Sequence, residues 1–106
     1  MKPKKSPDLL FSEKIERDGV VLAGFCSNRS TPCNAQIPII NQLAERYERK
    51  ALVKMIDVDE NRDLATSFQI TSIPTLIFFK KGIEIQRFVG LQKAEVLSHA
   101  IDAILG

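Results

Sequence analysis

The sequence predicts an α/β fold in which one mixed sheet of about four strands carries helices on both of its faces. Two patterns predict this class. A strand, a helix and a second strand follow one another over residues 20–58, and such a unit requires parallel strands joined by a right-handed crossover. Two further strands then flank Lys80-Lys81-Gly82, a turn that predicts an antiparallel hairpin. A chain of 106 residues is expected to form a single domain over 1–106.

Composition and charge argue against several classes of function. Hydrophobic residues make up 44% of the chain and charged residues 26%, as in ordinary globular proteins with a core. The formal net charge of +2 is too small to indicate nucleic-acid binding. Apolar runs stay below the roughly 18 residues that a membrane span requires. A signal-peptide pattern is not found either, so we expect a cytoplasmic protein. We also expect a monomer with no nucleic-acid or membrane partner.

The chain is expected to start with a flexible segment and a short helix. Residues 1–6 show no periodicity, so we expect them to be flexible. Ser6 or Asp8 is suited to cap a helix that reaches about Arg17. The continuous apolar run over 20–26 is typical of a central strand that is covered on both faces.

The next helix is predicted from Pro32 to about Lys50. Apolar side chains recur along it at intervals of three and four residues. This stripe consists of Ile37, Ile40, Leu43, Ala44 and Tyr47. Gln36 and most other polar side chains are expected to lie away from the stripe. Pro38 falls inside the helical pattern and predicts a kink about one turn after Cys33.

A strand and a second, shorter helix are expected to follow. The strand is predicted over 51–58. Asp59 is the predicted N-cap of a helix that reaches about Phe68. Leu64, Ala65 and Phe68 are expected to face the core.

The remaining elements are a loop, the hairpin and a last helix. The loop is predicted at 70–74, and the hairpin strands are predicted over 75–79 and 83–89. The last helix is expected over 93–105, with His99, the single histidine, on its exposed face. Its expected buried residues are Val96, Leu97, Ala100, Ile101 and Ile104.

The motif most informative about function is Ser30-Thr31-Pro32-Cys33. It joins the end of an apolar strand to the start of a helix, where free backbone N–H groups and the helix dipole favour an anion. A cysteine placed there ionises more readily, and the thiolate is the nucleophilic form. Cys-x-x-Cys at such a helix start indicates redox chemistry, but this chain has Ser30 where the first cysteine would stand.

From about Leu9 onward the chain resembles the thioredoxin family. The matching motifs occur in the family's order, and each alone would be weak. They are the apolar strand before Thr31-Pro32-Cys33, Pro38, Ile73-Pro74-Thr75, Phe79-Lys80-Lys81-Gly82 and Val89-Gly90. The resemblance implies a thioredoxin-like fold, a cis bond before Pro74 and protein-disulfide oxidoreductase activity. It also implies protein disulfide substrates, a separate reductase as the source of electrons, and no bound cofactor.

The resemblance also implies roles for individual residues. The family's attacking cysteine corresponds to Ser30, and its resolving cysteine corresponds to Cys33. Phe25 would contribute to the apolar surround of a groove that holds an extended substrate segment. The residues implied to bind substrate in this groove are Thr31, Pro32, Ile73, Pro74 and Gly90.

Several site positions depart from the family pattern. Two family tryptophans correspond to Cys26 and Arg29, and a buried aspartate with its lysine neighbour corresponds to Gly24 and Met55. The charges that handle protons are therefore missing. A serine does not attack a disulfide, and Cys33 alone cannot complete the two-step exchange.

Two interpretations of Ser30 stay open at this point. It is a Cys→Ser change in an otherwise working oxidoreductase, which would leave this chain impaired, or it is native to a redox-inactive module that binds extended polypeptide. Serine also caps helices well. A monothiol enzyme that uses glutathione is disfavoured, because such enzymes keep the first cysteine.

Cys26 has two interpretations as well. It is either a core residue at the end of a buried strand or an accessory thiol that forms a bridge with Cys33 or acts as a relay. A metal site is not expected, because neither cysteine has a second pair of ligands beside it.

Overall fold

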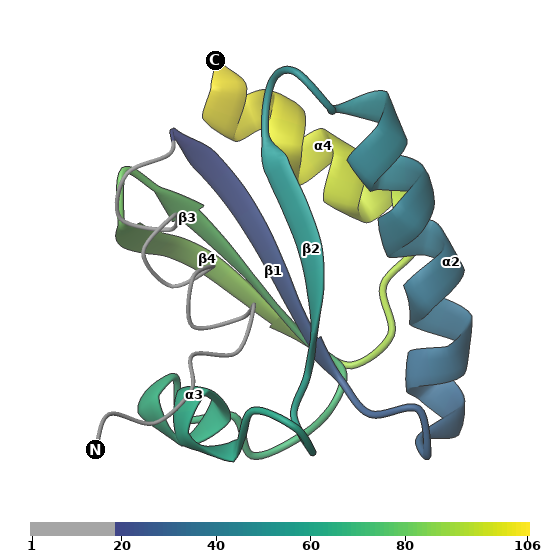
Figure 1. Cartoon of the computed structure of the whole chain (residues 1–106). Helices are drawn as coiled ribbons and strands as arrows, with labels where there is room; N and C mark the ends of the chain where they lie inside the picture. Colours follow the sequence, from purple (N-terminus) through teal and green to yellow (C-terminus); the bar gives the residue numbers. More distant parts are fainter. Residues whose placement is uncertain (1–18) are drawn as a thin grey trace.

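The computed structural model describes residues 19–106, which form a mixed four-stranded sheet with helices on both faces (Figure 1). The strands are β1 (Val20–Cys26), β2 (Leu52–Asp57), β3 (Thr75–Lys80) and β4 (Ile83–Val89). Their spatial order is β2-β1-β3-β4. β1 pairs in parallel with β2 and antiparallel with β3, and β3 pairs antiparallel with β4. The predicted fold class is confirmed.

Three helices lie within the described residues: α2 (Thr31–Arg46), α3 (Arg62–Ser67) and α4 (Ala94–Leu105). α2 and α4 pack together on one face of the sheet, and α3 packs on the opposite face (Figure 1). The helix predicted before Gly19 and the flexible start predicted over 1–6 lie outside the described residues.

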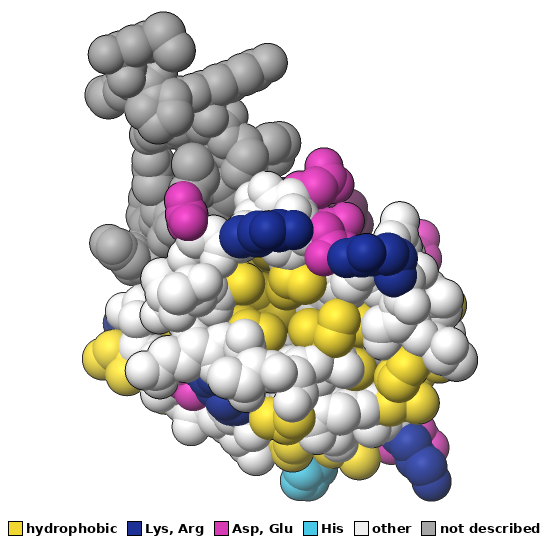
Figure 2. Space-filling model, turned by 90° about the horizontal axis from the view of Figure 1, so that it is seen from below, with side chains coloured by type: hydrophobic (Ala, Val, Ile, Leu, Met, Phe, Trp, Pro, Cys, Tyr) yellow, Lys and Arg dark blue, Asp and Glu magenta, His cyan; other side chains and the backbone are white. Residues whose placement is uncertain are grey.

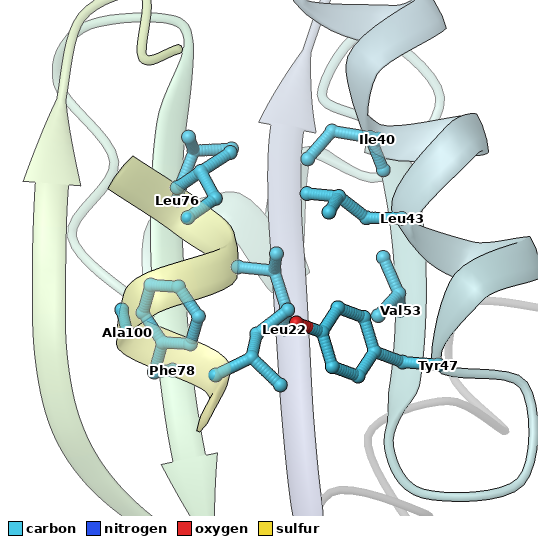
Figure 3. Close-up of a cluster of buried hydrophobic side chains, with 10 residues drawn as sticks. Leu22, Ile40, Leu43, Tyr47, Val53, Leu76, Phe78 and Ala100 are labelled. Atoms are coloured by element: carbon cyan, nitrogen blue, oxygen red, sulfur yellow. The ribbon is translucent and has the colours of Figure 1, made fainter. Parts of the chain in front are cut away.

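A hydrophobic cluster fills the space between the sheet and the pair α2 and α4 (Figure 3). Leu22 and Phe78 from the sheet meet Leu43 of α2 and Ala100 of α4. Tyr47, at the end of α2, is also buried in this cluster. Apolar burial on this scale is the main term that stabilises such a fold, at roughly 25 cal/mol for each Å² removed from water.

A second cluster lies under α3. Because successive side chains of a strand point to opposite faces, β1 supplies Leu22 to the first cluster and Val21 and Phe25 to the second. Phe68, directly after α3, packs on Phe25 and Phe79 with ring centroids 5.7 and 5.5 Å apart. Both faces of β1 are therefore covered, as its continuous apolar run predicts.

The hairpin turn also has the predicted form. Lys81 and Gly82 have φ values of 50° and 83°. Two consecutive residues with positive φ are typical of the type I′ turn that joins two antiparallel strands.

Two helix boundaries differ from the predictions. α2 ends at Arg46 rather than near Lys50, because the carbonyl of Tyr47 accepts the amides of Lys50 and Ala51 in a turn that leads into β2. α3 begins at Arg62, and its N-cap is Asn61 rather than Asp59.

Val96 is a further correction. It was expected to be buried, but 39% of it is exposed, while Leu97, Ala100 and Ile101 are buried. The buried face of α4 is instead completed by Ser98, whose Oγ lies 2.9 Å from the hydroxyl of Tyr47. None of the described helices is long and apolar enough to cross a bilayer.

Candidate functional site

The candidate site lies where β1 ends and α2 begins. Ser30 is the N-cap of α2, and its Oγ accepts the amide of Cys33 at 3.4 Å. Pro32 stands in the first turn, where a missing N–H costs nothing because those amides have no partner within the helix. Thr31 and Pro32 are exposed, Ser30 is half-buried and Cys33 is completely buried.

The prolyl loop lies before β3. The peptide bond between Ile73 and Pro74 is cis. The amide of Gly90 donates to the carbonyl of Pro74 at 2.8 Å, so the loop is tied to the end of β4. Gly90 has a φ of +98°, a conformation that favours glycine. Ile73, Pro74 and Gly90, which were predicted to share a groove, are thus brought together.

Gln36 connects α2 to the segment that follows β4. It was expected to lie away from the apolar stripe of the helix, and this prediction is wrong because Gln36 is completely buried. Its Oε1 accepts the amide of Gln92 at 2.7 Å, and its Nε2 donates to the carbonyl of Gln92 at 3.1 Å. The side chain of Gln92 donates in turn to the carbonyl of Gly90 at 3.2 Å.

Because Gly90 is bonded to Pro74, these contacts form a continuous set of hydrogen bonds from the first half of α2 to the prolyl loop. A polar side chain buried with both of its groups paired contributes to stability, whereas leaving its partners unpaired is costly. Gln36 therefore holds the segment after β4 in place. The prediction missed it because the apolar pattern assigns a glutamine to the solvent side.

Two thiols meet at the junction of β1 and α2. Cys26 and Cys33 are both free and buried, with 3% and 0% of their surface exposed. Burial is the main cause that raises the pKa of Cys26 far above its ordinary value, and a hydrogen bond with Cys33 and the nearby Cys33 and Asp57 charges raise it further. The Cys26 thiol is consequently protonated at neutral pH.

Gly24 and Met55, which the resemblance matches to the family's buried aspartate and its lysine neighbour, face each other across β1 and β2. A Cβ atom built on Gly24 would lie 2.6 Å from Sδ of Met55, so the methionine side chain fills this space. The floor of the site is therefore apolar at the two positions where the family pattern has charge.

A polar cluster surrounds Asp59, which was predicted to be a helix cap. Its carboxylate accepts the hydroxyl of Ser27 at 2.6 Å and a guanidinium N–H of Arg29 at 3.0 Å. These two hydrogen bonds, that of Ser27 first, lower the pKa of Asp59. The amide of Asp59 donates to Oδ1 of Asp57 at 2.8 Å, and this local turn keeps Asp59 outside the helix that follows.

The end of the molecule that carries α3 and the start of α2 is shown in Figure 2. Hydrophobic side chains gather in a hollow at its centre, with basic and acidic side chains along one border (Figure 2). Phe25 was predicted to line the groove, but it is completely buried in the second cluster, because its position in β1 points it toward α3.

Comparisons with known proteins agree on one family. A family model described as Thioredoxin matches residues 3–103. The thioredoxin of Staphylococcus aureus (strain Mu50 / ATCC 700699) is 40% identical over 98 residues, which cover 92% of this chain and 93% of that protein.

Solved structures give the same result. A mutant thioredoxin from Halobacterium salinarum NRC-1 matches with a TM-score of 0.83 and 31% identity, covering 98% of this chain and 97% of that chain. The oxidised thioredoxin of Plasmodium falciparum has a TM-score of 0.79 and 23% identity over 92% of each chain, a likeness that shows the fold alone.

Proposed function

The chain belongs to the thioredoxin family of thiol–disulfide oxidoreductases, and from that premise we propose that its site acts on disulfides of extended protein segments. The observation that carries the proposal is the arrangement of Ser30 and Cys33 at the start of α2. The hydroxyl that caps the helix stands at the position of the family's attacking thiol, and Cys33 lies buried behind it.

In the dithiol form of this site, a cysteine at position 30 attacks one sulfur of the target disulfide and expels the other as a thiolate. The thiol of Cys33 then attacks the sulfur at position 30 and releases the target in its reduced form. A separate reductase returns the electrons, and no cofactor takes part. We infer that this chain is a Cys→Ser form at position 30 and is impaired in that exchange.

The substrate segment binds between the start of α2 and the prolyl loop. Thr31 and Pro32 are exposed on one side, and Ile73 is half-buried on the other. The carbonyl of Pro74 already accepts the amide of Gly90, which leaves the backbone of Ile73 to pair with an extended segment in the manner of an added strand.

Restoring the missing thiol tests the proposal. The Ser30→Cys variant should reduce a model protein disulfide clearly faster than the parent chain when dithiothreitol supplies the electrons. Ser30→Ala is the matched control and should stay at or below the parent rate. Ser30→Cys with Cys33→Ala should instead accumulate a mixed disulfide with the substrate, because the resolving thiol is gone.

The second candidate is a redox-inactive module that binds extended polypeptide. The replacement of the family's charged pair by Gly24 and Met55 favours it, because the charges that handle protons in the exchange are absent there. A folded Ser30→Cys variant that is no faster than the parent would support this candidate. Binding of a reduced, extended peptide, weakened by substitution at Ile73, would then be the positive evidence.

We also propose that the chain works as one domain and as a monomer in the cytoplasm. Its two hydrophobic clusters share β1, so the described residues fold around a common strand. A reducing compartment agrees with two free cysteines. Sedimentation analysis would report the oligomeric state directly.

A further inference from the structure

We propose that Cys26 and Cys33 form a second redox pair in this chain, which closes to an intramolecular disulfide when a small disulfide reacts at Cys26. The inference takes its chemistry from the proposed thiol–disulfide exchange, but it does not require a cysteine at position 30. It assigns a reacting role to Cys26, which stands where the family pattern has a tryptophan.

The proximity of the two buried thiols is the first support. Cys26 is the last residue of β1, and Cys33 is the third residue of α2. The two thiols are buried neighbours between strand and helix, close enough for Cys33 to raise the pKa of Cys26. Neighbouring thiols can reach the bonding distance of about 2 Å by side-chain rotation when their backbones lie within about 7 Å.

A cavity next to Cys26 is the second support. It has a volume of about 160 Å³ and is lined by Cys26 together with Asn28 from the loop, Ile37 from α2, and Met55 and Asp57 from β2. Ile37 lies one turn after Cys33 on the same side of α2, so the cavity reaches Cys26 from the β2 side, while Cys33 lies behind it and does not line the cavity. Its size suits a small unbranched disulfide rather than a folded protein.

The order of the steps follows from access. Cys26 lines the cavity and reacts first: its sulfur attacks one sulfur of a disulfide R–S–S–R, the S–S bond breaks, and one R–S⁻ leaves with the proton given up by Cys26. The thiol of Cys33 then attacks the Cys26 sulfur. This second attack expels the other R–S⁻, which takes up the proton given up by Cys33.

The overall reaction balances in atoms and electrons. Two protein thiols and one small disulfide give one protein disulfide and two small thiols, so two electrons pass from the protein to the small molecule. Burial of both thiols makes the first attack slow, because the attacking species is the thiolate. A small thiol in excess reverses the reaction.

The test uses the full chain with Ser30 unchanged and bis(2-hydroxyethyl) disulfide as the probe. The reaction is run under native conditions. Samples are then quenched with acid, alkylated, and analysed by intact mass and peptide mapping. We expect the two thiols to disappear together, with a loss of two hydrogens, no retained adduct, and a cross-linked pair of peptides that contain Cys26 and Cys33.

Two variants separate the roles of the thiols. Cys33→Ala should retain the probe as a stable adduct on Cys26, because the resolving thiol is missing. Cys26→Ala should form no intramolecular bond and should react at least about tenfold more slowly at Cys33, a difference of roughly 1.4 kcal/mol in activation free energy. Circular dichroism checks that both variants are folded, and Cys26→Val replaces Cys26→Ala if that variant is not.

The proposed redox pair is refuted if the folded parent keeps both thiols or retains an adduct on one of them. It is also refuted if the Cys26–Cys33 disulfide forms only in denaturant, or if Cys26→Ala reacts as fast as the parent. Failure of the proposed function would look different, because Ser30→Cys would then show no gain with a protein disulfide whether or not the Cys26–Cys33 bond forms.

Discussion

Met55 occupies, from the neighbouring strand, the space that a side chain at Gly24 would need. The two residues are partners in the parallel register of β1 and β2. A Cβ on Gly24 would approach Sδ of Met55 to 2.6 Å and Cδ2 of Leu76 to 3.1 Å. A glycine and a thioether thus pack where the thioredoxin pattern has a carboxylate and an ammonium group, and the same Met55 side chain lines the cavity beside Cys26.

The first prediction concerns this contact. Gly24→Ala should lower the free energy of unfolding by about 1–3 kcal/mol, because the added methyl group overpacks the core against Met55 and Leu76. In a Met55→Ala background the same change should cost much less, since the space is then vacant. Urea denaturation of the four chains measures this coupling.

Gly19→Ala is the matched control, because nothing lies within 4 Å of a Cβ at that position. Its effect should stay within about 0.5 kcal/mol, as for most surface changes. Equal costs for Gly24→Ala with and without Met55 would contradict the packing account.

The second prediction concerns Gln36. Gln36→Leu should destabilise the chain by about 1–3 kcal/mol, because the amide and the carbonyl of Gln92 lose their buried partners. The amide of Gln92 should also exchange its hydrogen faster, since the segment after β4 is no longer bonded to α2.

Gln42→Leu serves as its control, because Gln42 is exposed on the same helix. That change should leave both the stability and the exchange rate at Gln92 nearly unchanged. If Gln36→Leu were as stable as Gln42→Leu, the two-point hydrogen bond would not be holding the segment in place.

The sequence was sufficient for the fold because its strongest patterns are local. The apolar run of β1 predicts burial on both faces, and both faces are covered. Lys81 and Gly82 form the two-residue turn that the flanking strands demand. Element order followed from such patterns, and the family motifs agreed with it.

Burial of polar side chains was harder to predict. The buried positions of α2 are 33, 36, 40 and 43, followed by its C-cap at 47, a regular alternation of three and four that includes Gln36. The spacing that indicates burial was therefore present in the sequence. The prediction placed Gln36 on the solvent side because it gave the polar type of the residue more weight than the spacing. Gln36 is buried because a backbone segment 56 residues away supplies both of its partners, and one-dimensional patterns do not contain that information.

The same limit applies at Asp59 and Phe25. An aspartate before a helix is a good cap, yet Asp59 binds Ser27 and Arg29 from the loop after β1. Phe25 belongs to the face of β1 that α3 covers, where it packs in the second cluster. Both outcomes depend on contacts between distant segments.

The third prediction concerns pH. Because the folded chain lowers the pKa of Asp59 below its ordinary value of 3.8, the ionised carboxylate favours the folded state. This stabilisation is fully present above the ordinary value, and it is lost as the pH falls through the lower pKa of the folded state.

Asp59→Asn should therefore be less stable than the parent at neutral pH, and the difference should shrink as the pH falls below 3.8. Unfolding free energies of both chains across the acid range provide the measurement. Added salt should weaken only the part that comes from Arg29, whose side chain is 78% exposed. A difference that grows toward acid would reverse the sign and refute this role.

The last prediction concerns the two functions of position 30. Ser30 caps α2 through its hydroxyl, and Ser30→Ala should cost about 0.5–2 kcal/mol of unfolding free energy. The contact is 3.4 Å long, so the cost should fall near the lower end of that range. Ser30→Thr, which keeps a hydroxyl, should lie close to the parent in the same denaturation experiment.

Ser30→Cys should resemble Ser30→Ala in stability when reduced, because a thiol is a weak hydrogen-bond acceptor, while only Ser30→Cys gains exchange with protein disulfides. Position 30 would then trade stability of the helix start against reactivity. A Ser30→Ala chain as stable as the parent would show that the hydroxyl contributes nothing as a cap.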